Sequence, residues 1–373
     1  MSKHVVVVQN FGQPAFTEVL AKRPDVRLHS LRRDTPGPEV AAVLGSAHAY
    51  HVSSGVNDVA PEYLVSPALL SRAPDLLLVS TMGAGYDSVD LAACTRAGVA
   101  VVNQSGGGNA EAVAEHVLAM MLCLSKRIVE SDRHMRREAG IVRGDYVGHN
   151  ALGKTVGIVG FGNVGTRLGE LCRAALQMRV LVCDEHRSAG YIRERGAEKT
   201  DLNGLLHRSD FVAICCALTD ETRGMIGARE FASMQKHAYF ITAARGGIHD
   251  ETALAEALIQ KRIAGAGVDV WDVEPPPPGH PLLLLDTVVA TPHIGGATVE
   301  SRVEAAEGAA RQILDALDGK RPPRLLNPEA WPAFCARFER IFGFRPEFTG
   351  THGDSAQSPC GSPDSNSRRQ EEP

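Results

Sequence analysis

Short, unbroken apolar segments recur along the chain and alternate with longer stretches of helical periodicity. A strand is apolar at every position, without alternation, when helices cover both faces of its sheet. Strands and helices that alternate over 373 residues therefore predict an α/β fold of doubly wound, Rossmann-like parallel sheets with right-handed crossovers. The apolar segments are Val5–Val8, Leu76–Ser80, Val99–Val102, Val156–Val159, Val180–Cys183, Phe211–Cys215, Tyr239–Thr242, Gly267–Val270 and Val288–Ala290.

Two helical stretches are unusually long and are preceded by glycines. One runs from about Asn109 to Arg133 after Gly106–Gly108, and the other begins after Gly295-Gly296 and ends near Gly319. Long helices with glycines before them, at both ends of one block, predict a crossing between two domains. We expect a cofactor domain at 107–296, inserted into a substrate domain made of 1–106 and completed by 297–345.

The chain after Arg345 has a different composition, in which Ser, Pro, Gly, Asp and Arg dominate. It holds too little apolar surface to offset the entropy lost on ordering. We therefore expect residues 346–373 to form a disordered tail.

Charge and cysteine content exclude several classes of function. With 39 basic and 44 acidic residues the formal charge is −5, so we expect no nucleic-acid partner. No segment reaches the roughly 18 apolar residues of a membrane helix, and Val5–Val8 is too short for a signal-peptide core, so we expect a cytoplasmic protein with no membrane partner. The eight cysteines form no Cys-x-x-Cys and no Cys/His cluster, which argues against a metal site and a disulfide framework.

The strongest local motif is Gly160-Phe161-Gly162-Asn163-Val164-Gly165, which directly follows an expected strand and opens an expected helix. In a dinucleotide-binding turn the first glycine permits the tight turn, the second lets a pyrophosphate approach the backbone, and the third lets the helix pack on the strand. The free N–H groups of the helix N-terminus then receive the phosphates. The motif therefore predicts a dinucleotide site at Gly160, Gly162 and Gly165.

Asp184 ends the next expected strand, 19 residues after Gly165. An acidic residue at about this distance binds the adenosine ribose of NAD. Its carboxylate would repel a 2′-phosphate, so NAD is favoured over NADP. Arg187, three residues later, keeps NADP open as the less favoured cofactor.

Three polar residues follow later strands of the same block: Arg245, Glu274 and His293. Ligands of open α/β sheets bind outside the carboxyl ends of the strands, so these side chains are able to converge. Each alone has an ordinary explanation, as a solvated arginine, a loop glutamate or a structural histidine.

Several motifs, in this order and spacing, closely resemble those of the D-isomer-specific 2-hydroxyacid dehydrogenases, and the likeness spans most of residues 1–318. They are Gly83-Ala84-Gly85-Tyr86-Asp87-Ser88-Val89-Asp90, Gly98-Val99 with Asn103, Ala114-Glu115-His116, Leu152-Gly153-Lys154-Thr155, Gly160–Gly165, Ala244-Arg245-Gly246-Gly247, Gly267–Pro275 and Thr291-Pro292-His293-Ile294-Gly295-Gly296.

The resemblance implies an NAD-dependent oxidoreductase that transfers hydride between nicotinamide and a small 2-keto or D-2-hydroxy acid. His293 would be the general acid/base, because imidazolium can give a proton to the carbonyl oxygen and take it back in the reverse direction. Glu274 would hold His293 and raise its pKa. Arg245 would bind the substrate carboxylate through its planar fork, joined by backbone N–H groups of Gly83, Ala84 and Gly85.

Further cofactor contacts follow from the resemblance. Asp269 would face the nicotinamide end, with a structural cap as its alternative role. The other residues expected beside the cofactor are Asn163, Val164, Cys216, Ala243, Ala244, Gly295 and Gly296.

The chain departs from the family pattern at the fourth cofactor strand, where Ile214-Cys215-Cys216-Ala217-Leu218-Thr219 replaces a Leu-His-x-Pro-Leu-Thr run. Thr242 and Gln177 replace a frequent Asn and Gly. Alanine does not fix φ as proline does, so cofactor affinity and loop shape are open questions. The adjacent Cys215 and Cys216 suggest redox sensing, but no evident cation stabilises a thiolate there.

The loops Val52–Gly55 and Ser80–Gly83 lack basic residues, which favours an unphosphorylated acid such as glyoxylate or hydroxypyruvate. A partner subunit could still supply arginines from 133–143. Formate or phosphite oxidation is a further option of the same class. An NAD-sensing interaction protein resembling the C-terminal-binding corepressors is the alternative from another class.

A homodimer is implied by the resemblance. The long helix from Asn109 also carries an apolar stripe that is broader than one domain face is expected to cover, as a dimer surface would be. Ordinary core burial is the alternative. The stripe consists of Val113, Val117, Met120, Met121 and Leu124.

Overall fold

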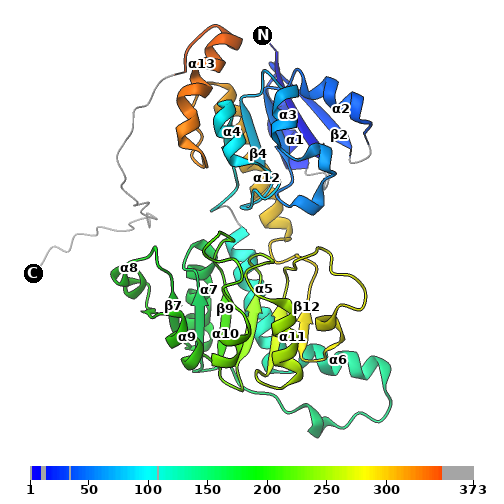
Figure 1. The fold of residues 1–373 in the computed structure, drawn as a ribbon, viewed down its shortest axis with the longest axis vertical. Helices are drawn as coiled ribbons and strands as arrows, with labels where there is room; N and C mark the ends of the chain where they lie inside the picture. The colour runs from blue at the N-terminus through cyan, green and yellow to red at the C-terminus, as the bar shows by residue number, and fades with distance from the viewer. Residues whose placement is uncertain (1, 10–13, 33–34, 107–108, 347–373) are drawn as a thin grey trace, which may run out of the picture.

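The computed structural model describes residues 2–9, 14–32, 35–106 and 109–346. Two all-parallel sheets, each covered by helices on both faces, form two lobes of the molecule (Figure 1). This confirms the predicted α/β class with doubly wound sheets. The expected tail at 346–373 lies outside the described residues except for Pro346, as do two of the glycines before Asn109.

The first sheet has five strands in the order β2-β1-β3-β4-β5. Its strands are β1 (Lys3–Gln9), β2 (Val26–Arg32), β3 (Ala49–Val52), β4 (Leu78–Thr81) and β5 (Ala100–Val102). Val5 and Val7 pack on one face against α1, α12 and α13, while Val6 and Val8 pack on the other against α2, α3 and α4. Burial of both faces explains why β1 is apolar at consecutive positions. The helices are α1 (Pro14–Ala21), α2 (Gly37–Leu44), α3 (Pro67–Arg72), α4 (Leu91–Ala97), α12 (Val299–Leu317) and α13 (Trp331–Phe342).

The second sheet has seven strands in the order β12-β11-β10-β9-β6-β7-β8. They are β6 (Thr155–Val159), β7 (Arg179–Cys183), β8 (Glu198–Lys199), β9 (Phe211–Ile214), β10 (Tyr239–Thr242), β11 (Gly265–Val268) and β12 (Val288–Ala290). Helices α5, α7 and α8 cover one face, and α9, α10 and α11 cover the other. These are α5 (Asn109–Ser125), α7 (Asn163–Leu176), α8 (Ala189–Glu194), α9 (Leu202–Arg208), α10 (Ala228–Ser233) and α11 (Glu251–Ile259).

The long helix expected from Asn109 to Arg133 is two helices, α5 and α6 (Ile128–Arg137), so that expectation was wrong. Arg127 breaks it with a left-handed φ of 55°. Its guanidinium bonds Glu130 and the Asp145 carbonyl, and no residue of α6 is buried. The helix stops where its apolar stripe stops, because α6 has no core to pack against.

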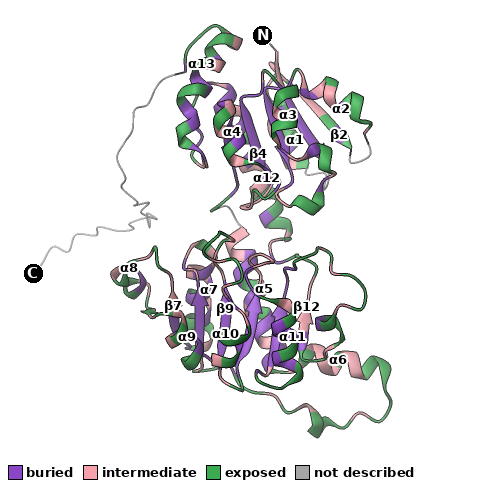
Figure 2. Ribbon diagram, viewed as in Figure 1, coloured by how far each residue is buried: buried purple, intermediate pink, exposed green. Residues whose placement is uncertain are grey.

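The apolar stripe of α5 is core and not a dimer surface. Its five members are all buried inside one chain, against the second sheet and α7, which corrects the expectation that they exceed one domain face. Four exposed apolar residues lie beyond the stripe instead, in the projecting segment that contains α6 (Figures 1 and 2): Ile128, Met135, Val142 and Val147. Within the described ranges, no helix combines the length and hydrophobicity needed to cross a bilayer.

Candidate active site

The fingerprint turn between β6 and α7 has the backbone geometry that its glycines predict. Gly160 has a φ of +90°, and a Cβ there would lie 2.6 Å from the Cys216 backbone. A Cβ on Gly165 would lie 2.1 Å from the carbonyl oxygen of Gly160. A Cβ on Gly162 would meet no atom within 4 Å, so open space lies in front of this residue. The two outer glycines are therefore required by the chain's own packing, and the middle glycine is required only by something that binds in that space.

The N-terminus of α7 is free to accept an anion. Its N-cap Gly162 offers no side-chain hydrogen bond, and the first intrahelical bond from the cap runs from Thr166 N–H to Gly162 O. The preceding N–H groups of Asn163, Val164 and Gly165 therefore point out of the helix end. Together with the open space at Gly162, these donors fit the pyrophosphate of a dinucleotide.

Asp184, just after β7, joins its own loop to the fingerprint turn. Its Oδ2 accepts the Phe161 N–H at 2.6 Å, and its Oδ1 accepts the His186 N–H at 2.9 Å. The carboxylate is partly exposed, so its remaining lone pairs can accept ribose hydroxyls. Cys216 lies against Gly160, and burial raises the pKa of its thiol to about 11. A neutral thiol here lines the turn and is a poor redox sensor.

His293 and Glu274 form the central pair of the site. Nδ1 of His293 lies 2.8 Å from Oε2 of Glu274, while Oε1 of Glu274 accepts the Trp271 backbone N–H at 3.0 Å. Because the carboxylate accepts at Nδ1, that nitrogen carries a proton and Nε2 is the atom left to exchange one. The imidazole side chain remains 38% exposed, so a substrate can reach it.

The pair also perturbs both ionisations. The hydrogen bond from Glu274, helped by its charge, raises the pKa of His293 against the opposing effect of burial and of Arg245. Burial favours the neutral form of Glu274, but the hydrogen bond and charge of His293 outweigh it and lower the pKa of Glu274. Both shifts favour an imidazolium beside a carboxylate, the form in which a histidine can donate a proton.

Asp269 fixes the turn that carries His293. Its buried carboxylate accepts the Ile294 N–H at 2.8 Å, the Gly295 N–H at 2.9 Å and the Thr291 hydroxyl at 2.6 Å. Its backbone oxygen accepts the His293 N–H at 2.7 Å, where His293 has a φ of 56°. These contacts are those of a structural cap, the alternative role that the sequence left open.

Arg245 reaches from the end of β10 to the loop after β4, and so joins the two sheets at the site. Its Nε lies 3.1 Å from Oδ2 of Asp87, and its Nη1 donates to the Ala244 carbonyl at 2.7 Å. Nη2 lies against Gly85, where a Cβ would come within 2.0 Å of it. The fork is therefore anchored on one side, and Nη2 is left to bind a ligand.

The loop after β4 offers fewer donors than expected. The Gly83 N–H already donates to Ser54 Oγ at 2.8 Å. Thr81 Oγ1 donates to the Gly85 carbonyl at 2.9 Å, and Asn103 Nδ2 donates to the Ala84 carbonyl at 2.7 Å, which fixes the loop. In the described part of the chain the N–H groups of Ala84 and Gly85 meet no acceptor, so these two are the donors available to a carboxylate.

The remaining expected cofactor residues lie at the same edge of the second sheet. Asn163 and Val164 open α7, Ala243 and Ala244 directly follow β10, and a Cβ on Gly296 would collide with Asn109 at the start of α5. Sequence reasoning assigned no role to Asp87 and Trp271. Asp87 was visible only as part of the Gly83–Asp90 motif, and nothing in the sequence indicated the Trp271 hydrogen bonds.

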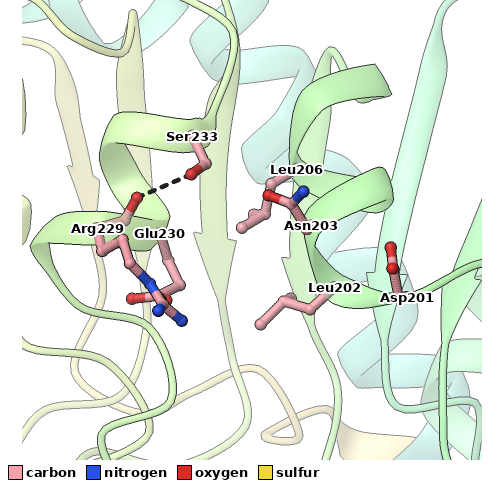
Figure 3. A pocket seen from close by; sticks show the side chains of 7 residues that line it. All are labelled: Asp201, Leu202, Asn203, Leu206, Arg229, Glu230 and Ser233. Atoms are coloured by element: carbon pink, nitrogen blue, oxygen red, sulfur yellow. Dashed lines mark hydrogen bonds and ion pairs between the residues drawn. The ribbon is translucent and has the colours of Figure 1, made fainter.

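A separate groove of about 450 Å³ lies between α9 and α10, away from these residues (Figure 3). Four of its five polar side chains are already engaged: the Asp201 carboxylate accepts the Gly204 N–H, Glu230 accepts from Gly227 and Arg229, and Ser233 donates to the Arg229 carbonyl. We assign no ligand to it. Across residues 2–346, where described, no cluster of His, Cys, Asp and Glu has the geometry of a metal site.

Comparison with known proteins finds a matching family model, similar sequences and similar structures. The model for "D-isomer specific 2-hydroxyacid dehydrogenase, NAD binding domain" matches residues 118–295. A glyoxylate reductase from Aeropyrum pernix is 39% identical over 267 residues, 70% of this chain and 79% of that protein. A D-3-phosphoglycerate dehydrogenase from Archaeoglobus fulgidus is 37% identical over 255 residues, 68% of this chain but only 48% of that longer protein. A crystal structure of a Thermus thermophilus protein superposes with a TM-score of 0.75 at 29% identity, covering 87% of this chain and 99% of that one.

Proposed function

Because the chain belongs to the family of D-isomer-specific 2-hydroxyacid dehydrogenases, we propose that it reduces a small, unphosphorylated 2-keto acid with NADH. The observation that carries this proposal is the convergence of His293, Glu274 and Arg245 at the sheet edge that also carries the dinucleotide turn. The family match supports NAD as the cofactor, and the open space at Gly162 with the free end of α7 fits it.

The bound nicotinamide would supply the hydride that reduces the carbonyl carbon. Arg245, through Nη2, would bind the substrate carboxylate together with the N–H groups of Ala84 and Gly85. With the acid so oriented, His293 would donate the proton on Nε2 to the carbonyl oxygen, an effect typically of about 10²–10⁴-fold. Glu274 stabilises the imidazolium before transfer and fixes its ring. In the reverse direction neutral His293 takes the proton back.

An unphosphorylated substrate is supported by the charges around Arg245. The side chain that the first sheet places against the guanidinium is the carboxylate of Asp87. A phosphate group on the substrate would approach this negative charge. Glyoxylate and hydroxypyruvate carry no such group.

The preference for NAD over NADP is supported by Asp184, whose carboxylate is held at the end of β7 by two backbone N–H groups. A 2′-phosphate would meet this negative charge. Arg187 lies with its guanidinium carbon 4.8 Å from the centre of the Tyr191 ring, so it is stacked on an aromatic side chain.

The test is an absorbance assay with a panel of keto acids and both reduced cofactors. We expect NADH oxidation with glyoxylate or hydroxypyruvate, slower oxidation with phosphohydroxypyruvate, and slower turnover with NADPH. Arg245→Ala and His293→Ala should abolish the measurable rate. A panel in which no acid gives oxidation dependent on these two residues contradicts the proposal.

The homodimer is part of this proposal and is supported by the segment around α6. Exposed apolar side chains gather there, with exposed fractions of 70% for Met135, 59% for Val142 and 74% for Val147. An apolar segment of this kind is usually covered by another surface, and a second copy would cover it. Light scattering should give twice the chain mass, and the double variant Met135→Glu, Val147→Glu should give one chain mass. A monomeric wild-type protein would contradict it.

The corepressor-like alternative is not favoured, because the relatives above are a reductase and a dehydrogenase and its distinguishing tail falls at 347–373, outside the described residues. The cytoplasmic location stays a prediction that cell fractionation would test.

A further inference from the structure

A second carboxylate–imidazole pair lies behind the catalytic pair. Glu251, the first residue of α11, places Oε2 at 3.1 Å from Nε2 of His280. Both side chains are nearly buried, with 13% and 15% of their surface exposed. Nδ1 of His280 accepts the Leu282 backbone N–H, so His280 is neutral at that nitrogen and donates from Nε2 to Glu251.

Glu251 also joins the loops that carry Glu274 and Arg245. Its Oε1 accepts the Asp272 N–H at 2.9 Å, and Oδ1 of Asp272 accepts the Gly247 N–H at 2.6 Å. The two backbones touch at this point, because a Cβ on Gly246 would lie 2.1 Å from the Trp271 carbonyl oxygen. Two carboxylates, those of Glu251 and Asp272, therefore fix the loop after β11 against α11 and the loop that begins with Arg245.

His280 supports the same loop from the other side. Its ring packs edge to face on Trp271, with ring centres 5.4 Å apart. The Trp271 backbone N–H holds Oε1 of Glu274, and its indole N–H donates to the Thr291 carbonyl at 2.9 Å, two residues before His293. The contacts thus run from the buried pair through Trp271 to Glu274 and to the backbone two residues before His293.

We infer that Glu251 and His280 are positioning residues: they orient the Glu274 carboxylate toward His293 and hold the loop of Arg245 in place beside this pair. Neither side chain contacts the residues assigned to substrate or cofactor. The inference rests on the proposed function for its catalytic consequence, while its geometric consequence, the strength of the contact between Glu274 and His293, is independent of turnover. Loops do not hold such an arrangement alone, and a misplacement of about 1 Å can cost about a hundredfold in rate.

Glu251→Gln is the informative variant because it changes no volume. The Gln side chain keeps an oxygen that accepts the Asp272 N–H. Its NH2 group then faces the Nε2–H of His280, so two hydrogen-bond donors oppose each other. Moving the histidine proton to Nδ1 would relieve that contact and create the same conflict with the Leu282 N–H. His280→Phe is the second variant, since it keeps the ring on Trp271 and deletes the hydrogen bond. Glu256→Gln, an exposed position on the same helix, is the matched control.

The experiment measures the pKa of His293 by NMR in the cofactor-free protein, and kcat, KM and melting temperature in parallel. In Glu251→Gln we expect the pKa of His293 to fall toward that of a free histidine, because Glu274 is no longer aimed at it. We expect kcat to fall about tenfold with a much smaller change in the keto-acid KM. His280→Phe should shift both in the same direction by less, and Glu256→Gln should match the wild type.

Two results would overturn the inference: a folded Glu251→Gln in which the pKa of His293 and kcat are unchanged, or a loss of kcat that follows melting temperature alone while that pKa stays at its wild-type value. If Glu251→Gln does not fold, His280→Phe decides by the same readouts. A wild-type protein without turnover would defeat the proposed function, and the NMR titration would still decide this inference.

Discussion

The two sheets are built on the same plan but differ at their carboxyl edges. In the first sheet, polar groups at the ends of β3 and β4 and in the loops that follow are paired with one another. The Gly83 N–H donates to Ser54, the Thr81 hydroxyl donates to the Gly85 carbonyl, and His51 is hydrogen-bonded to Ser80 in the buried interior. In the second sheet the turn after β6 leaves backbone donors free, and Nε2 of His293 faces outward after β12. The same architecture thus gives one lobe whose polar groups are largely paired with one another and one lobe with free polar groups that can bind a ligand.

The difference is clearest in two histidines. His51 is fully buried, stacks on Phe16 at 4.6 Å, and burial lowers its pKa to about 4. His293 is half-buried beside a carboxylate, which raises its pKa. Both are histidines near strand ends, so position in an α/β sheet does not decide function; the partner and the access to solvent do.

The largest contrast is expected from substituting these two histidines. His293→Gln should lower kcat by about 10²–10⁴-fold with little change in melting temperature, because it removes the proton donor from a partly exposed site. His51→Gln should leave kcat of the folded protein near wild type and lower the free energy of unfolding by about 1–3 kcal/mol, because it disturbs a buried polar contact. Steady-state kinetics and denaturant titration of both variants give kcat and the free energy of unfolding. A His51→Gln variant that loses kcat and a His293→Gln variant that keeps it would contradict the comparison.

Substitutions of the glycines in the fingerprint turn distinguish an effect on folding stability from an effect on cofactor binding. Gly162→Ala should fold as stably as the wild type, because its Cβ meets no atom. Its affinity for NADH should nevertheless fall at least about tenfold, which corresponds to a loss of about 1.4 kcal/mol of binding free energy. Gly165→Ala should destabilise the apoprotein, since its Cβ overlaps the Gly160 carbonyl. Gly37→Ala, also in open space, is the control. Calorimetric NADH binding and thermal melts test this, and equal NADH affinity in Gly162→Ala would contradict the assigned site.

The contribution of the first sheet is tested at Gly85. A methyl group there would displace Nη2 of Arg245, which is the flexible end of a side chain, so Gly85→Ala should fold normally. We expect the keto-acid KM to rise about tenfold while NADH affinity stays unchanged. Steady-state kinetics with each substrate varied in turn give both values. A change in NADH affinity alone would place this loop at the cofactor and not at the acid.

The smallest effect is expected at Asp184. Asp184→Asn keeps an acceptor for the Phe161 N–H but removes the charge that would repel a 2′-phosphate. The ratio of kcat/KM for NADH over NADPH should fall several-fold, mainly through better use of NADPH. An unchanged ratio would mean that Asp184 serves only to hold the turn.

Strands that contain an unbroken apolar segment could be predicted from the sequence, including the edge strands β5 and β12, and strands interrupted by polar residues could not. Unbroken apolar segments located β1, β6 and β10, whereas β2 mixes apolar residues with Arg27, His29 and Ser30 at the edge of its sheet. β3 was missed because its two buried faces carry Tyr50 and His51, whose polar ends find their hydrogen-bond partners only in the folded structure. The division of the chain at 106 and 297 remains a proposal.

The candidate site was predictable where a residue type and a strand end coincide. Arg245, Glu274 and His293 each follow a strand, and the glycines of 160–165 indicate their own turn. The ion pair of Arg245 with Asp87 and the support from Glu251 depend on loop conformations, which no periodicity encodes. The break at Arg127 was hidden for the same reason, because both flanking segments have helical character.

The pH dependence of keto-acid reduction in the wild type and in Glu274→Gln tests the central claim most directly. Reduction needs protonated His293, which exists below its pKa; since Glu274 raises that pKa, the wild-type rate should persist as pH rises through the ordinary histidine range and be lost only above it. In Glu274→Gln the falling limb of kcat/KM should move to lower pH. A limb that lies at the same pH in both proteins would show that the pair of His293 and Glu274 is not the proton donor of the reaction.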